Sequence, residues 1–401
     1  MSLIVQKFGG TSVANFECLQ NVAKIVVDTK KSGNDVVVVV SAQGDTTDLL
    51  EKKAAEISLN PPKREMDVLL SSGEQISMAL LSIAIEKMGL TCVSLTGWQA
   101  GFKTNMNHCK ARIEKIDTVR LKYELELNKI VVVAGFQGID KFDNITTLGR
   151  GGSDTSAVAI AAALGADLCQ IYTDVDGIYT ADPNLVENAF KLDEISYDEM
   201  LELSSLGAQV LHNRSVELAK RNNVSLEVLS SFKRVKGTKL KESVNMEKML
   251  IRGVTCDNDT ARIDLVGVSN EISLIYRIFA LLGNSNVNVD LIVQSIILND
   301  KNALSFTVAF EQLDLAKTII EKNMDELKVE KIRVLSSVSK VSIVGAGMQT
   351  NPGVAAKFFE ALYSANIDVQ MISTSEIKIS VLVDEADSAR AVKVVHEKFF
   401  E

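Results

Sequence analysis

The sequence predicts an α/β protein in which an open, mostly parallel sheet is sandwiched by helices and is followed by two smaller sheet-and-helix units. Strand and helix patterns alternate over the first 240 or so residues, which indicates parallel strands joined by crossover helices. Some strand patterns are continuous β-branched runs such as Val36–Ser41, typical of strands buried on both faces. The rest of the chain contains a repeat with an 80-residue offset, which marks duplicated units.

The elements of the first part follow from apolar periodicity. Short apolar runs predict strands at Leu3–Phe8, Val36–Ser41, Thr91–Thr96, Ile130–Phe136, Cys169–Val175 and Leu226–Ser231. Periodic apolar or charged stretches predict helices at Ser12–Lys31, Asp48–Leu59, Arg64–Met88, Cys109–Leu127, Asp154–Leu164, Tyr197–Leu211 and Val216–Arg221. Gln137–Thr147 is predicted as a hairpin. The polar stretch Lys233–Glu247 is interpreted as the domain boundary.

Composition excludes several classes of function. The chain has 401 residues and a net charge of −9 with no basic block, which argues against nucleic acid or a membrane surface as partner. We expect no membrane-spanning stretch, because the apolar runs look too short, and no signal peptide, because the N-terminus lacks the layout of one. The five cysteines form no CxxC pair and there are three histidines. We therefore expect no protein-held metal and a cytoplasmic location.

Polar residues and glycines recur where the predicted strands end. Lys7, Ser41, Thr96, Gly135 and Thr173 each stand at or next to the end of a different strand. In parallel sheets ligands bind beyond the carboxyl ends of the strands. Five such endings at one edge therefore predict a binding site there.

The first motif at this edge is KFGGTSV, Lys7 to Val13. Gly9 and Gly10 let backbone N–H groups approach an anion, and Thr11 or Ser12 can cap the next helix. The lysine precedes the glycines, so the motif is not a P-loop. The motif predicts a phosphate site, but an ordinary strand–turn–helix corner with a solvated lysine would have the same pattern.

The second motif is GRGGSDTSA, Gly149 to Ala157, in which Gly151 and Gly152 precede a helix. These glycines also expose N–H groups to an anion. Asp154 in the first turn could be a plain helix-start carboxylate. Beside the first motif in a parallel sheet, the pattern favours a phosphoryl-transfer site.

The motifs together resemble the aspartokinases, within the amino acid kinase family, and the resemblance covers essentially the whole chain. It implies ATP as phosphoryl donor, with Mg²⁺ held mainly by the phosphates. It also implies L-aspartate as acceptor, with 4-phospho-L-aspartate and ADP as products, the first step of lysine, threonine and methionine biosynthesis. The implied catalytic residues are Lys7 and Asp154.

The resemblance also implies binding residues. The expected aspartate contacts are Ser41, Thr47, Glu74 of the SSGE motif, Arg150 and Ser153. The expected ATP contacts are Lys7, Gly9, Gly10, Ser12, Gln209, and Thr173, Asp174 and Tyr179 of the segment YTDVDGIYTADP. Two positions depart from the family, since Asn184 and Gln209 stand where a basic residue is common. Both departures remove positive charge near the nucleotide.

The repeat resembles paired ACT domains, the amino-acid-sensing modules of this family. Asn286–Ser295 matches Asn366–Ser375 in spacing, and the same offset superposes Ile263 on Ile343. Each unit is expected to be a ferredoxin-like βαββαβ domain, with the first inserted in the second. The expected domains are a kinase domain at 1–240, ACT domain 1 at 258–330, and ACT domain 2 at 246–257 plus 331–401. The strand Leu250–Cys256 should then join the last unit's sheet.

These units predict feedback inhibition by lysine, alone or with threonine, and a homodimer or tetramer assembled through them. The loops Val268–Ser273 and Met348–Gly353 are expected to frame the pocket. Asp290 is assigned to the effector's ammonium group and Gln294 to a polar contact, with Met348 beside them. Asp290 could equally cap a strand end.

Two other functions stay open from the sequence. A related kinase could act on glutamate, an acylated amino acid or a nucleotide, but Glu74 and the paired ACT units argue against it. A non-catalytic amino-acid-binding subunit would not need Lys7, Arg150 and Asp154.

Overall fold

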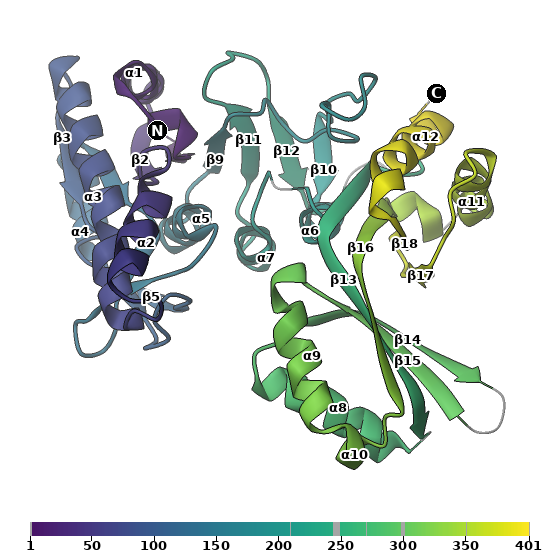
Figure 1. The fold of residues 1–401 in the computed structure, drawn as a ribbon. Helices are drawn as coiled ribbons and strands as arrows, with labels where there is room; N and C mark the ends of the chain where they lie inside the picture. Colours follow the sequence, from purple (N-terminus) through teal and green to yellow (C-terminus); the bar gives the residue numbers. More distant parts are fainter. Residues whose placement is uncertain are drawn as a thin grey trace. The chain divides into compact units, whose positions relative to one another are not determined.

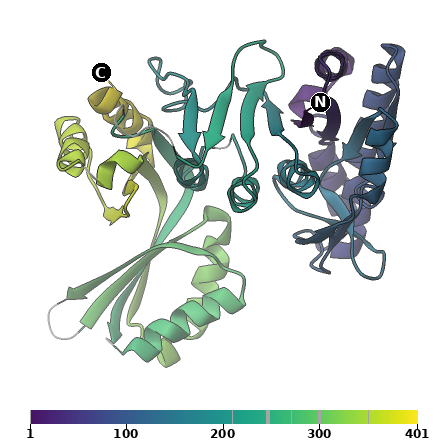
Figure 2. The ribbon, with the colours of Figure 1, turned by 180° about the vertical axis from the view of Figure 1, so that it is seen from behind.

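A computed structural model of the chain describes residues 2–208, 210–243, 249–269, 271–297, 301–349 and 351–400 (Figures 1 and 2). The chain divides into two compact units. The first comprises Met1–Tyr179, Lys191–Ser204 and Gln209–Val244, and the second comprises Thr180–Phe190, Ser205–Ala208 and Asn245–Glu401. Two short segments of the N-terminal part therefore belong to the C-terminal unit.

The first unit is built on an eight-stranded sheet with the order β10-β12-β11-β9-β1-β2-β6-β3. Its pairings are parallel except between β11 and β12. The strands are β1 (Leu3–Phe8), β2 (Asp35–Val40), β3 (Cys92–Leu95), β6 (Ile130–Ala134), β9 (Leu168–Thr173), β10 (Glu194–Ser196), β11 (Leu226–Ser230) and β12 (Thr238–Lys241). A small second sheet has the order β5-β4-β7-β8, with β4 (Phe102–Thr104), β5 (Ile113–Ile116), β7 (Gln137–Ile139) and β8 (Ile145–Thr147).

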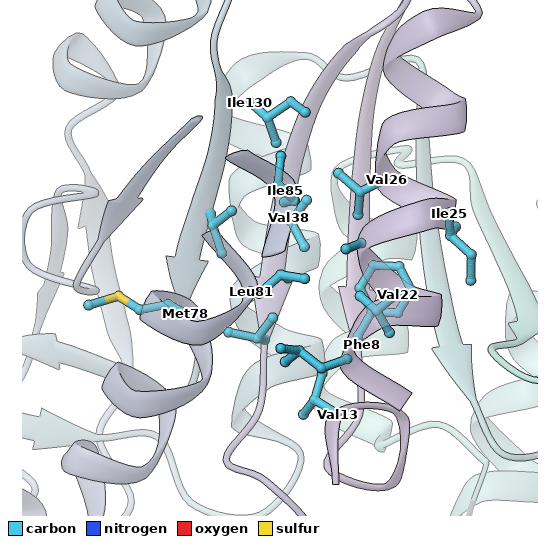
Figure 3. Packing of buried hydrophobic residues seen from close by; sticks show 14 of the residues in the cluster. Phe8, Val13, Val22, Ile25, Val26, Val38, Met78, Leu81, Ile85 and Ile130 are labelled. Atoms are coloured by element: carbon cyan, nitrogen blue, oxygen red, sulfur yellow. The ribbon is translucent and has the colours of Figure 1, made fainter. Parts of the chain in front are cut away.

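The helices of the first part cover both faces of the large sheet. They are α1 (Phe16–Lys31), α2 (Thr46–Ile57), α3 (Lys63–Lys87), α4 (Val119–Glu126), α5 (Gly152–Leu164), α6 (Tyr197–Ser205) and α7 (Asn213–Arg221). In the core, Val22 and Val26 of α1 and Leu81 of α3 pack with Val38 of β2 (Figure 3). The five valines 36–40 of β2 are all fully buried, which confirms the prediction of a strand covered on both faces.

Two predicted helices of this unit differ from the structure. The predicted helix Tyr197–Leu211 is too long, since α6 ends at Ser205, and the predicted helix Cys109–Leu127 is wrong. The stretch Cys109–Leu127 is not one helix, since β5 pairs antiparallel with β4 and α4 begins only after Thr118. Cys109 itself has φ of 65°, a left-handed conformation that no α-helix accommodates. The charged residues mimic helical periodicity, but β4 supplies the backbone hydrogen bonds that fix Ile113–Ile116 as a strand.

Helix α3 also differs from the sequence-based expectation about membrane-spanning stretches. It is long and apolar enough to cross a membrane by length and composition, with a mean hydropathy of 1.5 over 18 residues. Half of that window is buried inside the molecule, where α3 packs against α1, β3, β6 and β8. The apolar composition of α3 is therefore that of a core helix.

The second unit contains a six-stranded antiparallel sheet with the order β14-β15-β13-β16-β18-β17. Its strands are β13 (Gly253–Ser269), β14 (Val289–Ile297), β15 (Lys301–Val308), β16 (Lys331–Val344), β17 (Met371–Thr374) and β18 (Lys378–Asp384). Its helices are α8 (Ile272–Asn284), α9 (Leu313–Lys322), α10 (Met324–Leu327), α11 (Val354–Ser364) and α12 (Ser388–Phe400).

The two copies of the repeat share the long strands β13 and β16 (Figure 1). The start of β13, Gly253–Asp257, pairs with Val344–Lys340, whereas its end pairs with Leu335–Lys331. The predicted joining of this strand to the last copy's sheet is therefore observed. Asn286 and Asn366, equivalent in the repeat, both adopt positive φ, of 58° and 53°. The duplication thus extends to backbone conformation.

Candidate active site

A cavity of about 580 Å³ lies where β1, β2 and β6 end and α5 begins. It is enclosed by the glycine turns of both motifs and by side chains of α2 and α3. The lining residues are Lys7, Gly9, Gly10, Ser41, Ala42, Gly44, Thr47, Asp48, Glu51, Met66, Leu70, Glu74, Cys109, Lys110, Phe136, Thr147, Gly149, Arg150, Gly151, Gly152, Ser153 and Asp154. The two sequence motifs thus meet at the predicted edge of the sheet.

An ion pair joins the two motifs. Lys7 Nζ of β1 lies 2.6 Å from Asp154 Oδ1 of α5, and both side chains are about nine-tenths buried. A Cβ atom on Gly9 would lie 3.4 Å from Lys7 Nζ, and one on Gly10 would lie 2.9 Å from the carbonyl oxygen of Ala42. The glycines therefore leave room for the lysine and for the close approach of two loops.

The second glycine turn shapes the start of α5. Gly151 has φ of 66°, and a Cβ atom there would lie 2.3 Å from Cβ of His212. Only glycine fits this conformation and this space. Behind the turn, the N-terminus of the 13-residue helix α5 faces the cavity. A helix N-terminus favours a bound anion such as a phosphate.

Glu74 is the buried acid of the cavity. Its side chain is 3% exposed, and its Oε1 accepts a hydrogen bond of 3.1 Å from Ala42 N. Its Oε2 has no hydrogen-bond partner among the described residues. Burial raises the pKa of Glu74 to about 8, opposed by backbone hydrogen bonds. A buried carboxylate with one unpaired oxygen is a suitable partner for a cation.

The structure gathers the predicted aspartate contacts around this acid. Ser41, Thr47, Arg150 and Ser153 all line the same cavity as Glu74. Arg150 is exposed at the cavity, and its guanidinium group can bind a carboxylate through two parallel hydrogen bonds. The cavity thus offers Glu74 as a partner for an ammonium group and Arg150 as a partner for a carboxylate of a zwitterionic ligand.

The predicted nucleotide residues are arranged differently. Gly9 and Gly10 line the cavity, whereas Thr173, Asp174 and Tyr179 are not among the described residues that line it. Thr173 ends β9, and the N–H of Gly9 donates to the carbonyl of Tyr172 at 3.3 Å. That hydrogen bond places the end of β9 beside the first glycine turn.

Several residues predicted to contact the nucleotide form side-chain hydrogen bonds within the protein. Thr173 Oγ1 donates to Asp174 Oδ1 at 2.9 Å, and the hydroxyl of Tyr179 donates to Asp176 Oδ1 at 2.8 Å. Ser12 Oγ donates to Ser231 Oγ at 2.9 Å. Gln209 lies outside the described residues.

Sequence reasoning missed part of the cavity wall, namely Asp48, Glu51, Met66, Leu70, Cys109, Lys110, Phe136 and Thr147. Phe136 and Cys109, which line the cavity, have positive φ values of 68° and 65°. No sequence pattern predicts this conformation for residues other than glycine. Phe136 directly follows the strand-end Gly135, so the sheet-edge argument could have found it. Cys109 and Lys110 were missed because their segment was predicted to be helical.

In the second unit, the residues predicted for an effector do not share one cavity. Met348 lines a cavity of about 680 Å³ with Asn351, Pro352, Gly353, Val354, Ala355, Thr374, Ser375, Glu376 and Ile379. Asp290 Oδ2 instead lies 2.5 Å from Nζ of the buried Lys340, which also lies 3.3 Å from Asp257 Oδ2. Gln294 pairs with Leu304 between β14 and β15.

Comparison with known proteins gives matches over the whole chain. The amino acid kinase family model matches residues 2–230, and an ACT domain model matches residues 341–399. An aspartokinase of Bacillus sp. (strain MGA3) is 50% identical over 400 residues, which is 100% of this chain and 97% of the relative.

Solved structures that are similar over the whole chain are also aspartokinases. Aspartokinase III of E. coli in complex with aspartate and ADP, in the R-state, has a TM-score of 0.85 and 25% identity, with 100% of both chains covered. The same enzyme in complex with lysine and aspartate, in the T-state, has a TM-score of 0.77 and 25% identity, again with 100% of both chains covered.

Proposed function

Because this chain belongs to the aspartokinases of the amino acid kinase family, we propose that it transfers the γ-phosphoryl group of ATP to the β-carboxylate of L-aspartate. The products are 4-phospho-L-aspartate and ADP. The observation that carries the proposal is the single cavity in which the Lys7–Asp154 ion pair, Glu74 and Arg150 all lie. Aspartate bears one ammonium group and two carboxylates, and the cavity offers a partner for each charge.

The substrate is held by charge complementarity. The ammonium group pairs with Glu74, whose Oε2 needs a partner, and the α-carboxylate pairs with Arg150. Ser41, Thr47 and Ser153 supply neutral polar contacts. The β-carboxylate then faces the phosphate site between the two glycine turns.

Transfer of the γ-phosphoryl group requires positioning of the two substrates and neutralisation of negative charge. A β-carboxylate has a pKa of about 3.9, so it is ionised at neutral pH and needs no general base. One of its oxygens forms a bond to the γ-phosphorus as the bond from that phosphorus to the β,γ-bridging oxygen breaks, and ADP leaves with the electron pair. Lys7 stabilises the transferring group, and Asp154 orients Lys7 through their ion pair.

The nucleotide phosphates, rather than a protein cage, fit the role of Mg²⁺ ligands. Among the described residues, no group of three or more His, Cys, Asp or Glu side chains could hold a metal ion. Bound to the phosphates, Mg²⁺ would supply further positive charge to the transferring group. Ser12, Thr173, Asp174, Tyr179 and Gln209 are proposed contacts for the rest of the nucleotide.

A coupled ADP-release assay across acceptors tests this function. Wild-type protein should phosphorylate aspartate in preference to glutamate and N-acetylglutamate. Lys7→Ala should lose turnover by several orders of magnitude, because a transition-state charge partner is removed. Lys30→Ala is the matched control, since Lys30 pairs with Asp35 at 2.9 Å and is 9% exposed but lies outside the cavity lining. Near-normal turnover of Lys7→Ala, or faster phosphorylation of another acceptor, would refute the assignment.

The second unit is proposed to sense lysine, alone or together with threonine, in a cytoplasmic homodimer or tetramer joined through ACT domains 258–330 and 246–257 plus 331–401. Support comes from the duplicated βαββα units and from the lysine complex of E. coli aspartokinase III. Asp290, Gln294 and Met348 are the proposed contacts. Since Lys340 already pairs with Asp290 Oδ2, an effector ammonium at Asp290 would compete with Lys340 or bind the other carboxylate oxygen. With such feedback, the enzyme would catalyse the regulated first step of lysine, threonine and methionine biosynthesis.

Calorimetry tests the effector assignment. Lysine, threonine and their mixture are titrated into wild type, Asp290→Ala and Met348→Ala. Weaker lysine binding in Asp290→Ala alone supports the site on β14, whereas weaker binding in Met348→Ala alone moves the site to the cavity of that residue. No heat from lysine with wild type would end the lysine proposal.

A further inference from the structure

A second buried carboxylate of α3, Asp67, has no part in the mechanism above. It is fully buried and lies seven residues, about two helical turns, before Glu74. The two acids therefore project from the same side of the helix. Asp67 does not itself line the cavity, but Met66 beside it does.

Within the described part of the chain, every hydrogen bond to the carboxylate of Asp67 comes from the wall of the active-site cavity or from a residue next to it. Thr147 Oγ1 donates to Oδ1 at 2.5 Å, and His108 Nδ1 lies 2.6 Å from Oδ2. The backbone N–H of Cys109 donates to both oxygens, at 3.0 Å and 3.2 Å. Thr147 and Cys109 line the cavity. One buried carboxyl side chain thus holds two separate loops against α3.

The loops held in this way include the one that carries Arg150. Thr147 ends β8, three residues before Arg150, and the carbonyl of Thr147 accepts from Ala111 N at 2.9 Å. Cys109 has a left-handed backbone with φ of 65°, a conformation that is strained for a residue other than glycine. The hydrogen bonds from Cys109 N to Asp67 offset part of that strain.

A second clamp holds the far side of the same two loops. Arg214 of α7 donates from Nη1 to the carbonyl of Leu148 and from Nη2 to the carbonyl of Ala111, both at 2.9 Å. The Arg150 loop is therefore tied to α3 through Asp67 and to α7 through Arg214. The first glycine turn is tied elsewhere, through Gly9 N to the carbonyl of Tyr172.

We propose that Asp67 is a positioning residue that sets the span between Glu74 and Arg150, and so fits the cavity to the length of aspartate. The proposal rests on the function proposed above. Helix α3 fixes the positions of both Glu74 and Arg150. Glu74 is part of that helix, and the loop that carries Arg150 is hydrogen-bonded to the helix through Asp67. Loosening this link should weaken acceptor binding and leave nucleotide binding almost unchanged.

Steady-state kinetics of Asp67→Asn, with both substrates varied, tests the proposal. The amide keeps the shape, but its nitrogen is not an acceptor, so the loops lose part of their anchor. The Michaelis constant for aspartate should rise at least tenfold, and that for ATP should change less than twofold. The preference for aspartate over glutamate should fall as the span becomes less defined.

Variants of Thr147 separate positioning from folding. Thr147→Val removes the hydroxyl that bonds Asp67, whereas Thr147→Ser keeps it and should restore the wild-type Michaelis constant for aspartate. The matched control is Thr146→Val, because the Thr146 hydroxyl is equally buried but bonds Thr104 at 2.5 Å. Thr146→Val should cost similar stability and leave both Michaelis constants within twofold of wild type.

A double-mutant cycle completes the test. If Thr147 acts through Asp67, the effects of Asp67→Asn and Thr147→Val on the Michaelis constant for aspartate are not additive. Additive effects, or unchanged Michaelis constants in folded Asp67→Asn, would overturn the positioning role. If Asp67→Asn does not fold, Thr147→Val against Thr147→Ser still decides. Wild-type protein that fails to phosphorylate aspartate would instead refute the proposed function.

Discussion

At the scale of single residues, Glu74 shows how burial prepares a group for its ligand. Its Oε2 has no hydrogen-bond partner among the described residues, and burial raises the pKa of Glu74 to about 8. At neutral pH the free site therefore holds Glu74 mostly protonated. A substrate ammonium group would replace that proton, because a nearby positive charge favours the carboxylate.

This exchange predicts pH-dependent binding of aspartate with release of a proton. Between pH 6 and pH 8 the association constant should rise with pH, by up to tenfold per unit, and it should level off near pH 8. Calorimetry in two buffers of different ionisation enthalpy measures the proton released. Glu74→Gln, which has no proton to lose, should bind weakly and without this pH dependence. Binding to wild type that is flat from pH 6 to pH 8 would contradict the prediction.

The raised pKa also affects stability without ligand. The folded state retains a proton that the unfolded state loses above its ordinary pKa of 4.5. The unfolded state therefore binds fewer protons, and the free energy of unfolding should fall as pH rises from about 4.5 to about 8. Urea denaturation of wild type and Glu74→Gln across this range should show the decline in wild type alone. An equal decline in both proteins would assign it to other groups.

At the scale of elements, the sequence predicted the parallel core better than the small second sheet. β1 was predicted with its observed bounds, because a short apolar run just before a glycine turn is typical of a buried strand. The 109–127 region failed because its strand depends on a partner, β4, and on turns that need special conformations. Gly101 is one of these, with φ of 91° and the carbonyl oxygen of Asp117 only 2.0 Å from where a Cβ atom would lie.

Gly101 and Gly89 therefore form a matched pair for substitution by alanine. Gly89 has φ of 86° but nothing within 4 Å of a Cβ atom, so Gly89→Ala should cost about 1–2 kcal/mol from backbone strain alone. Gly101→Ala adds a clash with backbone that no rotamer relieves, and it should cost about 3 kcal/mol or more. Urea denaturation followed by Trp98, the single tryptophan, reports this region. Equal losses in the two variants would show that the 98–117 turn can move aside.

At the scale of the whole molecule, the sequence predicted the duplication but not the course of the chain between units. The repeat was visible because equivalent residues recur at one offset. The placement of Thr180–Phe190 in the second unit was not, because its packing partners lie far along the chain. The residues predicted to contact aspartate line one cavity but reach it in different ways, since Ser41 directly follows β2 whereas Glu74 lies within α3. Thr173, Asp174 and Tyr179, which were predicted to contact the nucleotide, are not among the described residues that line that cavity.

The segment Thr180–Phe190 should therefore depend on the C-terminal unit for its order. Thr180 Oγ1 lies 2.8 Å from Nε2 of the buried His396, its carbonyl accepts from Val254 N at 2.8 Å, and Val186 belongs to the core of the second unit. Hydrogen exchange should be faster at 180–190 in a fragment of residues 1–244 and in full-length His396→Ala.

In both proteins the amides of β2 should stay protected, which serves as the internal control for folding. Because the segment continues the proposed nucleotide-binding stretch, the Michaelis constant for ATP should rise in His396→Ala more than that for aspartate. Arg390→Ala is the matched control on the same helix, since its guanidinium pairs only locally with Asp387 among the described residues and is half exposed. Unchanged protection of 180–190 in the 1–244 fragment would show that this segment holds its structure without the second unit.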